Sequence, residues 1–275
     1  MIRLFKVITL LCGAVLLIAG SGPTDRNGNN PSMINNSLKM IAEGLQQNGI
    51  ASLRYDKRGI GESTMAGMQE DELRFEDYVD DASACIDYLN EVNRYSAVYV
   101  FGHSEGSLIG MIASQKAAVE GFISAAGAGK GAAEVIREQL ENQPLFVRET
   151  ANPLLDSLKT GHEVKNVPPY LMTLFRPSVQ PYLISWFKYD PSKQIAKLDI
   201  PVLILQGTTD IQVPVEQAEA LYDAQPNAQL EIIDGMNHIF KAAEADRMKN
   251  IQTYSMPDLP LIDGLLDSIL RFIKQ

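Results

Sequence analysis

The stretch YVFGHSEGSLIGM, residues 99–111, joins an apolar run to a glycine-flanked turn and a segment of small and apolar residues. β-Branched and aromatic residues over 97–101 predict a strand, and a helix is expected after the turn at 102–106. A tight strand-to-helix turn projects its central side chain from the carboxyl edge of a sheet, which gives the pattern Gly-x-Ser-x-Gly a structural meaning. Ser104 is therefore a candidate nucleophile. The alternative is a serine that only caps a helix.

A serine nucleophile needs a base that accepts its proton and a group that orients the base. The chain has three histidines. His103 adjoins Ser104 in a turn whose neighbouring side chains point apart, so we expect it to pack or to meet solvent. His162 lies in a polar stretch and is expected at the surface. His238 follows an alternating apolar run and a Gly-containing turn, which makes it the candidate base.

The orienting group should follow another strand between Ser104 and His238. PVLILQ, residues 201–206, is an apolar strand, and Asp210 lies in the loop after it. A simple turn aspartate is the alternative interpretation. Ser, Asp, His is nevertheless a chain order in which such triads occur, and all three residues would lie at carboxyl ends of strands.

Five motifs together resemble the α/β-hydrolase superfamily. GHSEG (102–106), LQGTTD (205–210) and GMNH (235–238) are similar to its nucleophile, acid and histidine motifs. LIAGSGPTDRNGNN (17–30) is similar to the loop after the third strand in a group of bacterial, serine aminopeptidase-like esterases, and YDKRGIGES (55–63) to the turn after the fourth. Five motifs in this order are far more specific than any one of them.

The resemblance implies a role for each group in an acyl transfer. His238 would take the proton of Ser104 as the hydroxyl attacks an acyl carbon, and Asp210 would hold the required tautomer. The backbone N–H groups of Ser21 and Glu105 are the expected oxyanion-hole donors.

Four charged residues are expected to support the loop that carries Ser21. Asp25 and Arg26 lie within that loop, and Asp56 and Arg58 lie in the turn after the next predicted strand. We expect Asp25 and Arg26 to pair with each other or with the Asp56–Arg58 turn. Ordinary surface charge is the alternative.

Composition narrows the functional classes. The chain has 275 residues, of which 45% are hydrophobic and 21% charged, and this suits one globular α/β domain. A formal net charge of −10 disfavours nucleic acid and an anionic membrane surface as partners. The two cysteines, Cys12 and Cys85, suggest neither disulfides nor a metal site and are expected to be buried. We predict no cofactor and no metal.

The first twenty residues admit two interpretations. Arg3, Lys6 and the apolar run 7–19 imitate a secretory signal peptide. AVLLIA, residues 14–19, also makes a good buried parallel strand that leads into the Ser21 loop. We favour the strand, which predicts a cytoplasmic protein, with secretion as the alternative. The run is too short to span a bilayer comfortably, so no stable membrane insertion is expected.

Superfamily members usually carry two more strands before this loop, so the resemblance implies a fold shortened at the N-terminus. Either residues 2–9 supply one edge strand, or the sequence is a shortened form of a longer protein. A sheet that lacks edge strands exposes apolar surface, which would favour a homodimer.

Periodicity predicts the remaining elements. Helices are expected over 36–48, 70–88, from the Ser104 turn to 116, over 215–224 and over 261–273, and strands near 14, 50, 97, 119, 202 and 229. This alternation predicts the α/β class with a doubly wound, mainly parallel sheet. It stops between 130 and 198, which we predict to be a helical cap inserted into a core of residues 1–129 and 199–275. Some apolar side chains of the cap should line an acyl or aromatic pocket.

The predicted function is hydrolysis of small-molecule carboxylic esters with small or aromatic acyl groups, through an acyl-enzyme. A serine aminopeptidase-like activity is the first alternative. It would need a carboxylate for the substrate's free amine, such as Glu105 or Glu149. The second alternative is a catalytically silent ligand-binding protein, although retention of Ser104, Asp210 and His238 disfavours it.

Overall fold

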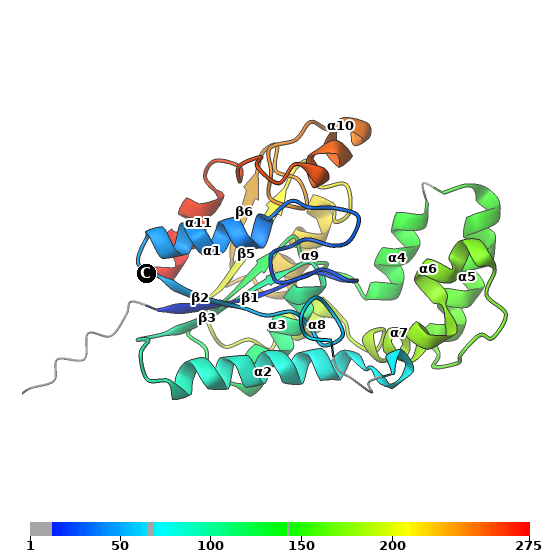
Figure 1. Ribbon diagram of the computed structural model, residues 1–275, viewed down its shortest axis with the longest axis horizontal. Coiled ribbons are helices and arrows are strands. Elements are labelled where there is room, and N and C mark those ends of the chain that lie inside the picture. The colour runs from blue at the N-terminus through cyan, green and yellow to red at the C-terminus, as the bar shows by residue number, and fades with distance from the viewer. Residues whose placement is uncertain (1–12, 65–68, 142) are drawn as a thin grey trace, which may run out of the picture.

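The computed structural model describes residues 13–64, 69–141 and 143–275. Within this part of the chain, six parallel strands form one sheet in the order β2-β1-β3-β4-β5-β6 (Figure 1). The strands are β1 (Ala14–Ile18), β2 (Ala51–Arg54), β3 (Val98–His103), β4 (Gly121–Ala125), β5 (Val202–Gly207) and β6 (Gln229–Ile233). The doubly wound, parallel α/β sheet predicted from the sequence is confirmed.

Strand β1 contains residues 14–18 of the N-terminal apolar run. It lies between β2 and β3, and each of its five side chains is at most 1% exposed. Leu16 and Ile18 enter the core on one face of the sheet, and Val15 and Leu17 enter the core on the other. Burial on both faces explains the uninterrupted apolar sequence, and the strand interpretation is confirmed. The edge strand expected over 2–9 lies outside the described residues.

Helices cover both faces of the sheet (Figure 1). The α-helices are α1 (Ser37–Gln47), α2 (Phe75–Glu91), α3 (Glu105–Lys116), α4 (Ala132–Leu140), α5 (Leu145–Lys159), α6 (Met172–Phe175), α7 (Gln180–Trp186), α8 (Pro191–Ile195), α9 (Val215–Ala224), α10 (Arg247–Gln252) and α11 (Leu265–Ile273). Helices α1 and α11 pack on one face, and α2, α3, α8 and α9 belong to the core of the other. No helix in the described ranges combines the length and the apolar character needed to cross a bilayer.

Two predicted helices begin later than expected. The helix expected from residue 70 is first a short 3₁₀ turn (Glu70–Glu72), and α2 begins only at Phe75 because Leu73 and Arg74 have extended backbones. The closing helix begins at Leu265 rather than 261, because Gly264 at φ 84° interrupts it. Cys85 on α2 is half-buried rather than fully buried, and Cys12 lies outside the described residues.

The segment between β4 and β5 forms α4 to α8, together with the 3₁₀ turns Pro169–Leu171 and Pro177–Val179. Helices α4 to α7 project to one side of the sheet (Figure 1), whereas α8 packs against α3 and α9. The hydroxyl of Tyr182 on α7 donates to Glu105 at the start of α3. The projecting helices therefore lie on the side where the parallel strands end.

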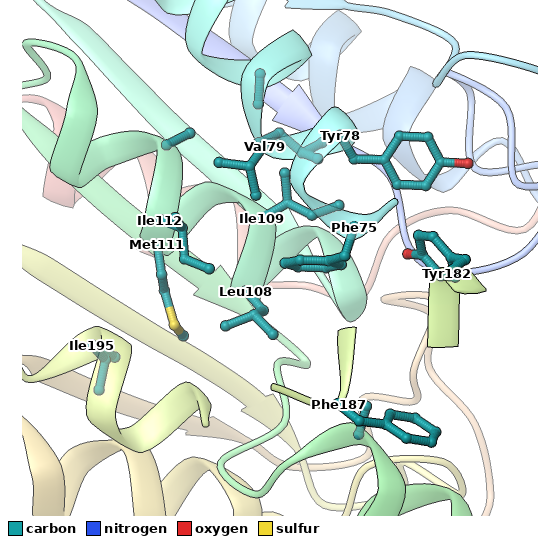
Figure 2. Packing of buried hydrophobic residues seen from close by; sticks show 14 of the residues in the cluster. Phe75, Tyr78, Val79, Leu108, Ile109, Met111, Ile112, Tyr182, Phe187 and Ile195 are labelled. Carbon is teal, nitrogen blue, oxygen red and sulfur yellow. The ribbon is translucent and has the colours of Figure 1, made fainter. Parts of the chain in front are cut away.

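Aromatic side chains join α2 to α7 (Figure 2). The Phe75 ring stacks on Trp186 with ring centroids 6.2 Å apart, and Tyr182 packs against Phe75 and Tyr78. The backbone N–H of Phe75 donates to the hydroxyl of Ser185 at 2.7 Å. This contact anchors α7 close to the carboxyl edge of the sheet.

Candidate active site

Ser104 occupies the turn between β3 and α3 with φ 55° and ψ −120°. Such angles are strained for a residue with a side chain and persist only where the surroundings enforce them. A Cβ on Gly102 would lie 2.6 Å from Cα of Ser107, and a Cβ on Gly106 would lie 2.7 Å from the carbonyl oxygen of Ala19. Backbone packing therefore requires both glycines of Gly-x-Ser-x-Gly, as expected for a turn that projects its serine.

Asp210 and His238 lie in the loops after β5 and β6. Their side chains are 1% and 6% exposed, and Oδ2 of Asp210 lies 2.8 Å from Nδ1 of His238. Because the strands are parallel, their carboxyl ends meet at one edge of the sheet, which is also the edge of the Ser104 turn. The structure thus places all three residues at this edge.

Further donors hold the Asp210 carboxylate. Oδ1 accepts from the backbone N–H groups of Gln212 at 2.8 Å and Val213 at 2.9 Å, and Oδ2 accepts from Nε2 of Gln206 at 3.0 Å. Burial opposes ionisation, but His238 and these N–H groups prevail and lower the pKa of Asp210 below its ordinary value. Gln206 was not among the site residues predicted from the sequence. Its signal was a polar residue at the end of the apolar strand PVLILQ.

Asn237 fixes the loop that carries His238. Its Oδ1 accepts from the N–H groups of Ile239 at 3.2 Å and Lys241 at 3.0 Å, and its Nδ2 donates to Oγ1 of Thr253 at 2.8 Å. Asn237 is fully buried. This network, also missed from the sequence, sets the position from which the His238 ring extends.

His103 packs in the interior rather than meeting solvent. Its ring centroid lies 4.8 Å from that of His238, and its Nε2 donates to the His238 carbonyl oxygen at 2.9 Å. Burial, with a smaller contribution from His238, lowers the pKa of His103 to about 3. The ring is therefore neutral at physiological pH and supports His238 from the side.

This neutral histidine predicts a pH-dependent stability. The folded-state pKa lies below the ordinary value of about 6.5, so the unfolded chain binds a proton first as the pH falls. As the pH falls from about 6.5 to about 3, His103 should therefore lower the free energy of unfolding by up to about 1.4 kcal/mol for each pH unit. Urea unfolding of wild type and His103→Gln at pH 7, 6 and 5 measures this effect. We expect the free energy of unfolding to fall more steeply with decreasing pH in wild type than in His103→Gln. Parallel curves would contradict the assignment.

The turn after β2 holds the Ser21 loop at two points. Nζ of Lys57 donates to the carbonyl oxygen of Gly20 at 2.6 Å. Oδ1 of Asp56 accepts from the backbone N–H of Arg26 at 2.7 Å, and the Arg26 guanidinium lies 2.8 Å from Oδ2 of Asp56. Two consecutive residues of one turn therefore secure the beginning and the middle of the loop.

Asp25 and Arg58 contact other groups than the expected ones. Oδ1 of Asp25 accepts from the N–H groups of Asn27 at 2.8 Å and Asn29 at 2.9 Å, so it stabilises its own loop from within and does not pair with Arg26. Arg58 pairs with Asp81 on α2. The expected pairing of Arg26 with this turn occurs through Asp56, whereas Arg58 does not support the loop because its side chain extends to the α2 side of the turn.

Two backbone donors border Ser104. A Cβ on Gly20 would lie 3.2 Å from Cβ of Ser104, so the Gly20–Ser21 peptide adjoins the candidate nucleophile. Glu105 is the first residue of α3, where helical N–H groups have no partner within the helix. Within the described ranges, the N–H groups of Ser21 and Glu105 have no hydrogen-bond acceptor in the protein. They are free to bind an anion.

A buried ion pair lies beside these donors. Nζ of Lys57 and Oε2 of Glu105 are 2.8 Å apart, with side chains 1% and 2% exposed. The hydroxyl of Tyr182 donates to the other carboxylate oxygen of Glu105. Glu105 therefore offers no free carboxylate for a substrate amine. Lys57, the middle one of three consecutive charged residues, was not predicted from the sequence.

Among the described residues, no three His, Cys, Asp or Glu side chains are grouped to hold a metal ion.

The family described as serine aminopeptidase, S33 (Hydrolase_4) matches residues 35–173 of this chain. The chain belongs to this family. It is therefore an α/β-hydrolase, as the fold and the Ser104 turn also indicate.

Esterase EstD of Thermotoga maritima is 30% identical over 241 residues, which are 84% of this chain and 55% of that protein. The chain thus spans about half the length of this curated relative.

Solved structures share the fold. Est1E of Butyrivibrio proteoclasticus with bound ferulic acid superposes with a TM-score of 0.63 at 20% identity, over 96% of this chain and 91% of that one. The esterase EaEST of Exiguobacterium antarcticum gives 0.57 at 15% identity, over 95% and 92%. A bromoperoxidase of Bacillus anthracis gives 0.56 at 16% identity, over 96% and 92%. Because neighbours of different named activity share it, the fold alone does not fix the reaction.

Proposed function

We propose that this family member hydrolyses carboxylic esters, with Ser104 as nucleophile, His238 as general base and Asp210 as the group that orients the base. The observation that carries the proposal is the buried Asp210–His238 pair, 2.8 Å apart, at the sheet edge from which the strained Ser104 turn projects. The esterase name of the relative from Thermotoga maritima supports the choice of esters.

In the proposed reaction, Oγ of Ser104 attacks the acyl carbon and Nε2 of His238 takes its proton. Nδ1 of His238 keeps its hydrogen bond to Asp210, whose carboxylate stabilises the imidazolium. The negative charge on the former carbonyl oxygen is stabilised by the N–H groups of Ser21 and Glu105. His238 then protonates the leaving alcohol. In the second half of the reaction His238 takes a proton from water, whose oxygen attacks the acyl carbon, and returns the proton to Oγ of Ser104 as the carboxylic acid leaves.

We propose that residues 130–198 form a cap over this site and that the acyl group is small or aromatic. The contact between Tyr182 on α7 and Glu105, next to Ser104, supports a cap position. Est1E, which shares the fold, binds ferulic acid.

A peptidase activity is the competing reaction, because the family is described as serine aminopeptidase. Such an enzyme needs an acidic group near the site for the substrate's α-amine, and the carboxylate nearest the nucleophile in sequence, Glu105, is already neutralised by Lys57. This arrangement favours esters over peptides with a free amino terminus as substrates.

Substrate panels test this preference. We expect the purified protein to hydrolyse p-nitrophenyl acetate, p-nitrophenyl butyrate and methyl ferulate with kcat/KM at least about 10²-fold above that for alanine and proline p-nitroanilides, because the amine lacks a free acidic partner. Initial rates at pH 7.5 give the comparison. Faster cleavage of the anilides would assign the site to peptide substrates instead.

A further inference from the structure

The side chains of Lys57, Glu105 and Tyr182 form a buried cluster that has no part in the reaction steps above, yet it contacts both segments that carry the proposed oxyanion donors. Lys57 lies in the turn after β2, Glu105 begins α3, and Tyr182 lies on α7. A buried ion pair contributes little net stability compared with apolar packing, so its position beside Ser104 calls for another explanation. We propose that Lys57 is a positioning residue that aims the Ser21 N–H into the oxyanion hole and that Tyr182 couples this arrangement to α7.

The geometry of one peptide unit gives the first step. The carbonyl oxygen of Gly20 and the N–H of Ser21 belong to the same peptide, and no cis peptide occurs among the described residues. In a trans peptide the C=O and N–H bonds point in opposite directions. Because Nζ of Lys57 holds the Gly20 oxygen at 2.6 Å, it turns the Ser21 N–H away from Lys57. The Gly20 Cα adjoins Ser104, so the freed donor borders the nucleophile.

The second step concerns how Lys57 is itself fixed. Nζ lies 2.8 Å from Oε2 of Glu105 and 4.9 Å from the centroid of the Tyr78 ring. The backbone N–H of Glu105 is the other proposed oxyanion donor, so Lys57 ties the two donor-bearing segments to each other. The α3 backbone sets the direction of the Glu105 N–H, and the ion pair holds the Gly20–Ser21 peptide in register with it. Preorganised donors of this kind avoid reorganisation at the moment of reaction.

The third step links α7 to the same cluster. The Tyr182 hydroxyl donates to Oε1 of Glu105. Its ring packs edge-on against Tyr78, with centroids 5.5 Å apart, and Figure 2 shows these two side chains. Burial and the Glu105 carboxylate raise the pKa of Tyr182 well above its ordinary value, so the hydroxyl keeps its proton. A displacement of α7 would remove one of the two partners of Glu105 and loosen the donor next to Ser104.

The test replaces the ion pair by neutral residues of similar size, because Lys57→Met alone would leave a buried unpaired carboxylate. This inference rests on the proposed ester hydrolysis. In Lys57→Met/Glu105→Gln we expect kcat for p-nitrophenyl butyrate to fall about 10²-fold, as for the loss of one oxyanion donor, with KM changed less than about threefold. The affinity of an aryl trifluoromethyl ketone, which forms a tetrahedral oxyanion on the serine, should fall by a similar factor.

Two controls separate positioning from general damage. Arg58 follows Lys57 in the same turn but pairs with Asp81 on α2, so Arg58→Met should leave kcat within about threefold of wild type. Tyr182→Phe should lower kcat about three- to tenfold through loss of a hydrogen bond to a charged group. Tyr189→Phe, which removes a similar bond to Glu76, should not.

The outcomes distinguish the two proposals. A wild-type protein without Ser104-dependent ester hydrolysis overturns both. Ester hydrolysis that depends on Ser104 but is unchanged in kcat and inhibitor affinity in Lys57→Met/Glu105→Gln overturns the positioning role alone. Equal kcat in Tyr182→Phe and Tyr189→Phe overturns the coupling to α7. An equal loss of kcat in Arg58→Met would show a general effect on stability and would also overturn the positioning role.

Discussion

Ser104→Ala is expected to lower kcat for p-nitrophenyl butyrate by about 10⁴- to 10⁶-fold, because the proposed covalent route through the serine oxygen is then closed. Binding should be retained, since the strained turn is set by Gly102 and Gly106 and not by the hydroxyl. Steady-state rates together with a fluorophosphonate label, which should mark wild type and not the variant, give the measurement.

Ser114→Ala is the matched control for this substitution. Ser114 lies on the same helix, α3, and its buried hydroxyl has no hydrogen-bond partner among the described residues. Its removal should leave turnover within about twofold of wild type. Ester hydrolysis that persists in Ser104→Ala would place the nucleophile elsewhere, and a folded wild type without turnover or labelling would favour the ligand-binding alternative.

Asp210→Asn is expected to lower kcat by about 10⁴-fold. Oδ1 of Asp210 accepts two backbone N–H groups, so an asparagine would keep its carbonyl oxygen there and turn its NH₂ toward His238. Nδ1 of His238 would then have to accept a hydrogen bond, which moves the ring proton to Nε2. In that tautomer Nε2 cannot take the proton of Ser104. The kcat value in the pH range above the ordinary histidine pKa gives the measurement.

Asp234→Asn is the control, because Asp234 follows the neighbouring strand β6 but is exposed, and its carboxylate accepts from the Thr208 hydroxyl at 2.9 Å and from no other described side chain. It should retain wild-type turnover. An Asp210→Asn protein with normal turnover would show that another group orients His238.

The outline of the fold could be predicted because it depends on local patterns. An apolar run buried on both faces marks a central parallel strand, as in β1, and alternating residues mark a strand such as β6. The helices α1, α3 and α9 and the six strands follow these patterns closely. Boundaries set by single backbone conformations, such as the extended Leu73 and Arg74 before α2, carry no periodic signal and were placed wrongly.

The candidate triad was predictable for a related reason. Ser104, Asp210 and His238 each follow a strand, and the carboxyl ends of parallel strands necessarily meet at one edge of the sheet. The residues that hold them were harder to find, because Gln206 and Asn237 act through hydrogen bonds to backbone groups whose directions depend on the folded loops.

By itself, the sequence determined the α/β class, the placement of Ser104, Asp210 and His238 after successive predicted strands, and the glycines that shape the Ser104 turn. Only the tertiary structure decided which partner each charge of the turn Asp56-Lys57-Arg58 meets. Lys57 enters the interior to meet Glu105, Arg58 extends to α2 and Asp56 binds Arg26. The physical reason is that three adjacent charges look alike along the chain, and their roles depend on partners brought together from distant segments.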